Sequence, residues 1–592
     1  MKNKSDGLKI SRWDLGDLFP SADSEEFKQA LSLLESAVAD FEQRREDLGD
    51  SIDQRKFLEI IKEFEEITTR MHTIGGYAEL WFTEDTQDQK AQSLLAKVEQ
   101  LSADISNRVM FFTLWWKSIE DEIANPLMED VGDYHYWLEE MRHQKPFTLS
   151  EPEEKIINIK DVTGASALVN LYDAFTNRYT FQLTLDHEEK ELTRGELMAL
   201  VRRPNSNLRA AAYQELYRVY GNDGPILGQM YQTRVRDWRN ELINLRGHAT
   251  PISARNLHND IPDEVVETLL LVSKKNTDIF QRFFKLKARL LGMKNLRRYD
   301  IYAPISQSNK EFAFDKAIDL ILDSFGQFDP VFSDMAVQVL EERHVDSEVR
   351  KGKRSGAFCA TITPNLTPWV LVNYQRRSED VATLAHELGH AIHSLLAKDH
   401  SIFTQHACLP LAETASTFGE MMLVDRLMEE ESDENVRRDL LFRQVDDSYA
   451  TIMRQSFFAL FEKEAHQMTF DGASVDDLSN AYFKNLQAQF GDNIDISEEF
   501  KWEWVSIPHI YHVPFYVYAY AFGKLLVLSL YKQYKAEGDA FKPKYINILS
   551  TGGAQAPIDL LSNSGIDVTK QSFWQGGFDV IDSLVNQLER LN

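Results

Sequence analysis

The sequence contains almost no cysteine. Only Cys359 and Cys408 occur among its 592 residues, and neither belongs to a Cys-x-x-Cys pair. Two such residues cannot form a disulfide framework, which excludes the small disulfide-stapled folds of secreted proteins. The first ten residues also lack the apolar stretch of an export signal. Both absences predict a reducing compartment, and we expect a cytoplasmic protein.

Blocks of positive charge and long apolar runs are missing as well. The chain has 93 acidic and 65 basic side chains and a net charge of -28, which argues against a nucleic-acid partner. The most apolar stretch, 513–528, is headed by Pro514 and interrupted by Lys524, and its tyrosines would need hydrogen-bond partners in lipid. We therefore expect a buried helix there and no membrane partner.

Proline and glycine rarely interrupt the chain, and apolar residues recur with a helical period. One stripe follows a capping pair formed by Asp23 and Glu26; it consists of Phe27, Leu31, Leu34, Val38 and Phe41. Further helices are predicted at 56–82, 89–120, 262–290 and 435–468. The nearest candidates for strands are 358–362 and 369–374, so the fold class is mostly α. No internal repeat was found.

The most informative motif is His386-Glu387-Leu388-Gly389-His390. Positions i and i+4 share one helix face, so the imidazoles of His386 and His390 converge on one metal ion. Glu387 follows the first ligand, where its carboxylate reaches a metal-bound water without binding the metal. Residues 381–396 contain no proline and one glycine, which favours a helix. The motif predicts a hydrolytic zinc site; the alternative is a surface helix with two ordinary histidines.

The third ligand decides which zinc class this is. A metzincin would have glycine and histidine where this chain has His393 and Leu396, so that class is excluded. A second predicted helix at 411–420, about two dozen residues on, supplies Glu413 as the third ligand. Glu420, two turns later on the same face, is predicted to orient a ligand histidine, or else is an ordinary solvated glutamate. His393 remains an alternative ligand.

A short predicted strand, 369–374, lies about a dozen residues before the zinc motif. Beside a zinc helix, an edge strand pairs with an extended peptide through main-chain hydrogen bonds. The alternative is a small structural hairpin with 357–362, and both arrangements could hold together. We assign the peptide-contacting backbone to Ala357 and Phe358.

Residues 507–520 are dense in side chains that stabilise an oxyanion. Tyr516 and Tyr520 are four residues apart, so both hydroxyls emerge on one side of a helix. His509 lies just ahead, in a segment bounded by proline. The alternative is aromatic core packing with satisfied hydroxyl groups.

The chain resembles the oligoendopeptidase F branch of the thimet-oligopeptidase/neurolysin metallopeptidases over nearly its whole length. The zinc motif and Ala412-Glu413-Thr414-Ala415-Ser416 carry most of the resemblance. Weaker similarities lie in the segments 12–20, 147–156, 298–304 and 355–359. The chain departs from this branch at Gly419, where asparagine is usual.

The resemblance implies two helical halves around a deep substrate channel, with zinc on its floor and a small β-hairpin or sheet beside the zinc helix. The sparse proline and glycine signals predict domain boundaries near 115 and around 190–205, where residues 203–207 break the helical pattern. We therefore expect an N-terminal helical region at 1–115, an oligoendopeptidase-type N-terminal domain at 116–200 and a catalytic domain at 201–592. A histidine and tyrosines face the zinc in this family. His509, Tyr516 and Tyr520 are the matching positions here, with Tyr518 and His512 as alternates.

These observations predict a zinc endopeptidase with one Zn²⁺ per chain that cleaves short, unstructured oligopeptides. Glu387 would act as general base, and donors from the 507–520 segment would stabilise the oxyanion. One alternative is a zinc exopeptidase, in which Arg376, Arg377 or Arg454 would capture a terminal carboxylate. The other is a peptide-binding helical scaffold without catalysis, although Glu387 would have no purpose there.

Overall fold

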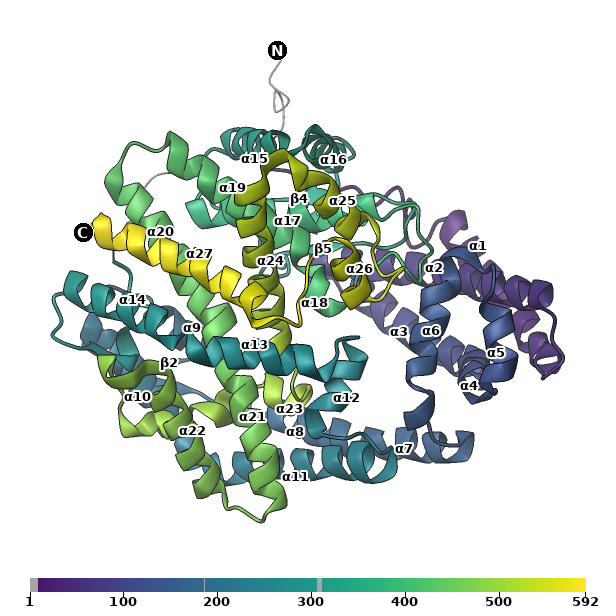
Figure 1. Cartoon of the computed structure of the whole chain (residues 1–592), viewed down its shortest axis with the longest axis horizontal. Coiled ribbons are helices and arrows are strands. Elements are labelled where there is room, and N and C mark those ends of the chain that lie inside the picture. The colour runs from purple at the N-terminus through teal and green to yellow at the C-terminus, as the bar shows by residue number, and fades with distance from the viewer. Residues whose placement is uncertain (1–8, 186, 306–310, 592) are drawn as a thin grey trace. The chain divides into compact units, whose positions relative to one another are not determined.

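The computed structural model describes residues 9–185, 187–305 and 311–591, most of which are helical (Figure 1). The chain forms two compact units, each assembled from three separate segments. Unit 1 comprises 1–145, 309–430 and 533–567, and unit 2 comprises 146–308, 431–532 and 568–592. The predicted mostly helical class is confirmed. The domain boundaries at 115 and 200 stay a prediction.

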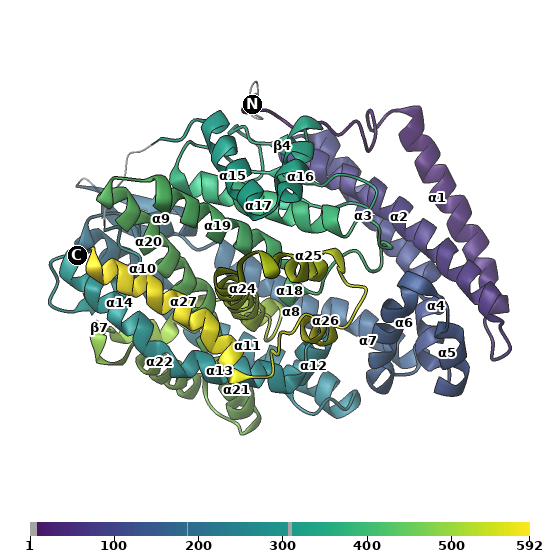
Figure 2. The same ribbon diagram turned by 45° about the horizontal axis from the view of Figure 1, so that its top comes forward.

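Unit 1 begins with long N-terminal helices that share one aromatic core. In Figures 1 and 2, α2 lies beside both α1 and α3. Phe57 stacks on Trp116 with ring centroids 4.9 Å apart, and Trp369 from a later strand is buried in the same core. The helices are α1 Glu25–Gln43, α2 Gln54–Glu84, α3 Gln89–Val109, α4 Phe111–Ser118, α5 Asp121–Met128 and α6 His135–His143.

The first predicted helix is confirmed, but its N-cap is wrong by one residue. Ser24, not Asp23, is the N-cap of α1, and its hydroxyl accepts a hydrogen bond from the Phe27 amide at 3.2 Å. Four of the five predicted stripe residues are buried, and Leu31 is partly buried. Serine and aspartate are about equally good N-caps, so the sequence preference could not separate these neighbours.

The remainder of unit 1 carries the zinc motif. Helices α17 and α19 lie side by side, with α15 and α16 packed next to them (Figure 2). The elements are α15 Phe314–Phe328, α16 Pro330–Glu341, β4 Val345–Asp346, β5 Phe358–Ala360, β6 Trp369–Leu371, α17 Ser378–Leu396, α18 Leu409–Ala412, α19 Thr414–Glu430, α25 Lys542–Ser550 and α26 Pro557–Asn563.

The small sheet of unit 1 has the strand order β4-β6-β5, with β5 antiparallel to β6 and β4 parallel to it. The predicted hairpin between the two strand candidates is therefore confirmed. The prediction that 369–374 forms an edge strand is wrong, because β6 has a neighbour on each side. Its three residues are fully buried, which suits a central strand; the short β4 could not be anticipated from two residues.

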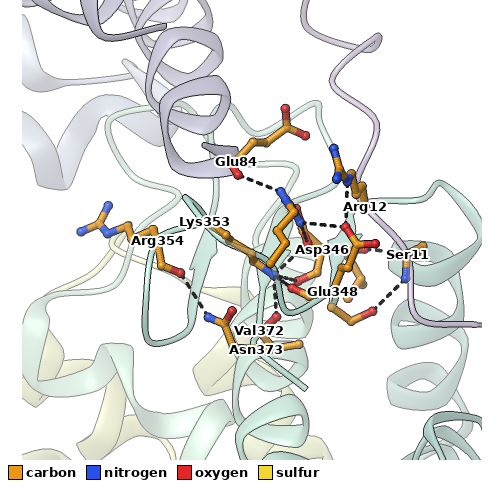
Figure 3. A network of polar contacts seen from close by, with 12 residues as sticks. Ser11, Arg12, Glu84, Asp346, Glu348, Lys353, Arg354, Val372 and Asn373 are labelled. Carbon is orange, nitrogen blue, oxygen red and sulfur yellow. Dashed lines mark hydrogen bonds and ion pairs between the residues drawn. The ribbon is translucent and has the colours of Figure 1, made fainter. Parts of the chain in front are cut away.

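A buried ion network braces the loop between β4 and β5 (Figure 3). The ammonium group of Lys353, which has no exposed side-chain surface, donates to the Asp346 carboxylate at 2.8 Å and to the Val372 carbonyl at 2.7 Å. Arg350 donates to both Asp346 oxygens and, at 3.0 Å, to the carbonyl of Glu84 at the end of α2. The network fixes the chain that leads into β5.

Unit 2 is also helical, and several predicted helices are confirmed with interruptions. The segment 262–290 breaks at Asn276 into α13 and α14, and 435–468 contains a π-helical turn, η6. The elements are α7 Glu151–Thr163, α8 Ala165–Asn177, β1 Phe181–Leu185, β2 Glu188–Leu192, α9 Arg194–Leu200, α10 Ser206–Asn222, α11 Gly224–Trp238, the π-helix η4 Arg239–Leu245, α12 Pro251–His258, α13 Asp263–Lys275, α14 Thr277–Leu290, β3 Leu296–Arg297, α20 Glu434–Ser448, η6 Tyr449–Met453, α21 Arg454–Phe470, α22 Val475–Phe490, β7 Ile494–Asp495, α23 His509–His512 and α27 Gln571–Arg590.

The β1–β2 hairpin was not predicted, since β2 is almost entirely polar and exposed and shows no alternation. The apolar stretch at 513–528 does enter a buried helix, α24 Tyr518–Glu537, as expected. Across the part of the chain that the structure describes, we find no helix with both the length and the apolar character needed to cross a membrane.

Candidate metal centre

Three predicted ligands converge in unit 1. The Nε2 atoms of His386 and His390 lie 3.2 Å apart, and Glu413 Oε2 lies 3.3 Å from the first and 3.5 Å from the second. A tetrahedral zinc ion with ligands at about 2.0–2.1 Å requires ligand separations of about 3.3–3.4 Å. The donor set and its spacing therefore fit zinc. His393 lines the same cavity but is not part of this group.

Neighbouring side chains orient the ligands. Glu420 Oε1 accepts a hydrogen bond from His386 Nδ1 at 2.5 Å, so the Nε2 atom of this ring faces the site. The Ser416 hydroxyl donates to Glu413 Oε2 at 2.8 Å. The sequence predicted the position of Glu420, whereas Ser416 received no role although it lies in the same motif. Such outer partners fix ring and carboxylate orientations around a metal.

The electrostatics of the site call for a cation. Burial lowers the pKa of His386, but hydrogen bonds with Glu413 and Glu420 outweigh burial and raise it to about 10. Burial lowers the pKa of His390 to about 4. The carboxylates of Glu413 and Glu420 thus favour a positive charge at His386. A divalent ion would supply such a charge.

Glu387 is placed as the motif predicts. It lies on α17 between the two histidines, is 6 % exposed and lines the same cavity. Burial raises the pKa of its carboxyl to about 7. A carboxylate with a proton affinity near neutrality is suited to accept and return a proton.

Close helix packing brings Glu413 to the histidines. The sequence predicted Glu413 within a helix. The structure places it at the junction of α18 and α19 instead. Gly389 of α17 faces this junction: a Cβ atom there would lie 2.6 Å from Ser416 Cα and 2.8 Å from the Ala415 carbonyl oxygen. The glycine inside the motif therefore sets the distance between the two ligand-bearing segments.

We expect Gly389→Ala to destabilise unit 1 by about 1–3 kcal/mol through overpacking, and to lower its zinc affinity. Gly75→Ala on α2 is the matched control, because a Cβ atom there meets nothing within 4 Å. Chemical denaturation and competition with a zinc chelator measure the two effects. Equal stability and affinity in both variants would contradict this role for Gly389.

The candidate metal site opens into a cavity of about 760 Å³ within unit 1. One wall is β5 with the preceding loop, and another is α2 through Gly76, Glu79 and Leu80. Arg354 at the rim lies 3.6 Å from Glu79. Sequence reasoning missed this contribution of the N-terminal helices to the site, because α2 carries only an ordinary amphipathic pattern.

The register of the sheet shows which backbone groups of β5 face outward. The Val370 amide donates to the His344 carbonyl directly before β4, so the polar backbone groups of the next residue, Leu371, point to β5. Leu371 pairs with Phe358, so the backbone amide and carbonyl of Phe358 face β6 and are not available to a peptide. By alternation, those of Cys359 and Ala357 lie on the outer edge. The register thus favours Cys359 over the predicted Phe358, together with Ala357, for pairing with a peptide.

The predicted oxyanion donors cluster in unit 2. The ring centroids of Tyr516 and Tyr520 lie 5.2 Å apart, and that of His509 lies 6.3 and 6.1 Å from them. Burial and nearby cationic side chains lower the pKa of His509. The two alternates have other partners: His512 contacts Asp173, and the Tyr518 hydroxyl accepts from Asn259.

Family models match most of the chain. The model described as peptidase family M3 matches residues 199–580, and the model described as oligopeptidase F matches residues 115–181. The chain belongs to peptidase family M3. The resemblance seen in the sequence motifs is confirmed.

Curated relatives in this M3 branch align with the full chain. Group B oligopeptidase PepB of Streptococcus agalactiae is 28% identical over 100% of this chain and 98% of its own. Oligopeptidase PepF of Bacillus subtilis is 26% identical over 100% of this chain and 88% of its own. The crystal structure of oligoendopeptidase-F from Enterococcus faecium shares the fold, with a TM-score of 0.72 and 22% identity over 96% of this chain and 99% of that chain.

Proposed function

We propose that this M3 peptidase is a zinc-dependent oligoendopeptidase that hydrolyses internal bonds of short, unstructured peptides. The observation that carries the proposal is the convergence of His386, His390 and Glu413 at zinc-compatible separations, directly beside the buried Glu387. The names of the relatives described above, oligopeptidase and oligoendopeptidase-F, support this substrate class.

In the proposed mechanism, His386, His390 and Glu413 would hold the metal. Zinc, when bound, supplies a Lewis acid that polarises the scissile carbonyl and lowers the pKa of water. Glu387 takes the proton of the attacking water at its carboxylate oxygen and delivers it to the leaving amine nitrogen. Glu420 and Ser416 hold the ligands in place meanwhile.

The peptide would extend along the outer edge of β5, with the backbone groups of Ala357 and Cys359 as partners. Main-chain pairing of this kind binds extended peptides with little side-chain preference. His509, Tyr516 and Tyr520 would donate hydrogen bonds to the developing oxyanion. This assignment rests on the family resemblance, in which a histidine and tyrosines face the zinc.

A blocked, internally quenched peptide of about ten residues tests the proposal, a length suited to a site that admits only short chains. We expect internal cuts, identified by mass spectrometry, that vanish with a zinc chelator and return with added zinc. A folded protein should survive under the same conditions. Trimming of a free-ended peptide without cleavage of the blocked one would replace the proposal with an exopeptidase. Zinc binding without cleavage of either would replace it with a scaffold.

A further inference from the structure

The backbone just before the tyrosine pair adopts an unusual conformation. Phe515 has a φ angle of +61°, in the left-handed region that bulky residues seldom occupy. Tyr516 follows directly, and α24, which carries Tyr520, starts two residues later. The direction in which the chain enters α24, and so the placement of both phenol rings, depends on this turn. Surrounding contacts must hold such a conformation in place.

A buried carboxyl group supplies one of these contacts. Glu462 on α21 has no exposed surface, and its Oε1 accepts a hydrogen bond from the Phe515 amide at 2.9 Å. One turn further along α21, the ring of His466 packs against the ring of Phe515 with centroids 4.6 Å apart. On the other side of the turn, Arg255 Nε donates to the Pro514 carbonyl at 3.2 Å.

Among the described residues, Glu462 forms no ion pair that would explain its burial. Arg255 exerts only a weak attraction on it, and burial raises the pKa of Glu462 to about 8. The second oxygen, Oε2, has no hydrogen-bond partner among the described residues. Burial thus favours the protonated form of this carboxyl group, and its contact with the Phe515 amide needs only an oxygen acceptor. A glutamine side chain offers the same acceptor in nearly the same shape.

We propose that Glu462 is a positioning residue of the peptidase: it anchors the left-handed turn at Phe515 and thereby holds Tyr516 and Tyr520 in the orientation that catalysis requires. Glu462 touches neither substrate nor metal in this role. The catalytic part of the inference rests on the proposed function, whereas the anchoring of the turn does not.

Three variants on α21 test the role by kinetics on the blocked peptide. Glu462→Leu removes the acceptor, and we expect kcat to fall about 10–100-fold, because a displaced donor loses part of the 10²–10³-fold effect of an oxyanion donor. KM should change by less than about threefold, since the donors act in the transition state. Glu462→Gln should restore kcat. Glu464→Leu, at an exposed position on the same helix, should behave as the wild type.

The conservative variant distinguishes positioning from general stability. A similar loss in Glu462→Gln and Glu462→Leu, or a wild-type kcat in Glu462→Leu, would overturn the proposal. A crystal structure of Glu462→Leu adds an arm that does not depend on activity. We expect Phe515 to leave the left-handed region there, and an unchanged turn would overturn the anchoring. A wild-type protein that cleaves no peptide would refute the proposed function alone, because the crystal structure still decides the anchoring.

Discussion

Replacement of Glu387 by glutamine is expected to lower kcat for peptide hydrolysis by about 10²–10⁴-fold, the usual contribution of a positioned general base. The amide keeps the shape of the side chain and cannot accept the proton of the attacking water. The metal ligands are unchanged, so the variant should still bind one zinc ion per chain. Single-turnover kinetics and metal analysis of the same preparation measure the two quantities.

Glu379→Gln is a suitable control for this substitution. Glu379 lies in the first turn of α17, is exposed and pairs with Arg377 on the surface. Its change to glutamine should leave kcat and zinc content unaltered. Turnover close to that of the wild type in Glu387→Gln would refute the assignment of the base, and a loss of zinc would assign this residue to metal binding instead.

Glu413→Ala is expected to abolish activity through loss of the metal. Only two of the three protein ligands, both histidines, remain in this variant. Zinc should therefore be lost during dialysis against a chelator concentration at which the wild type keeps its zinc. Metal content and activity should fall together. A variant that keeps its zinc under these conditions would show that another side chain, such as His393, is the third ligand.

Glu420→Ala should have a smaller effect on the same measurement. Glu420 accepts the hydrogen bond of His386 Nδ1 and is not one of the three converging ligand side chains, so its loss should weaken zinc binding by about 10–100-fold. Added zinc should restore most of the activity of Glu420→Ala and none of that of Glu413→Ala at matched concentrations. Equal losses in the two variants would contradict the distinction between ligand and orienting residue.

Local spacing made much of the metal site predictable. His386 and His390 are four residues apart, so on a helix both side chains lie on one face, and Glu387 lies next to the first of them. Glu413 was predicted from the kind of ligand that completes such a pair, and Glu420 from helical spacing. Neither prediction described the junction of α18 and α19, because helix breaks depend on packing as well as on sequence.

The strand predictions show where local pattern is insufficient. The buried run of β6 was recognised as a strand, but its place in the centre of the sheet depends on β4, which is only two residues long. Pairing partners are set by residues far apart in the chain. Which backbone groups of β5 face outward follows from that pairing and from nothing within β5 itself.

The sequence by itself determined the helical class, the placement of His386, Glu387 and His390 together on one helix, and the likeness to the M3 peptidases. All of these depend on short-range spacing and residue type. Only the tertiary structure revealed that Gly389 allows α19 to approach α17, that α2 forms a wall of the cavity, and that Glu462 contacts the turn at Phe515. These features join residues that are tens to hundreds of positions apart. Close packing decides such contacts, and no local periodicity encodes them.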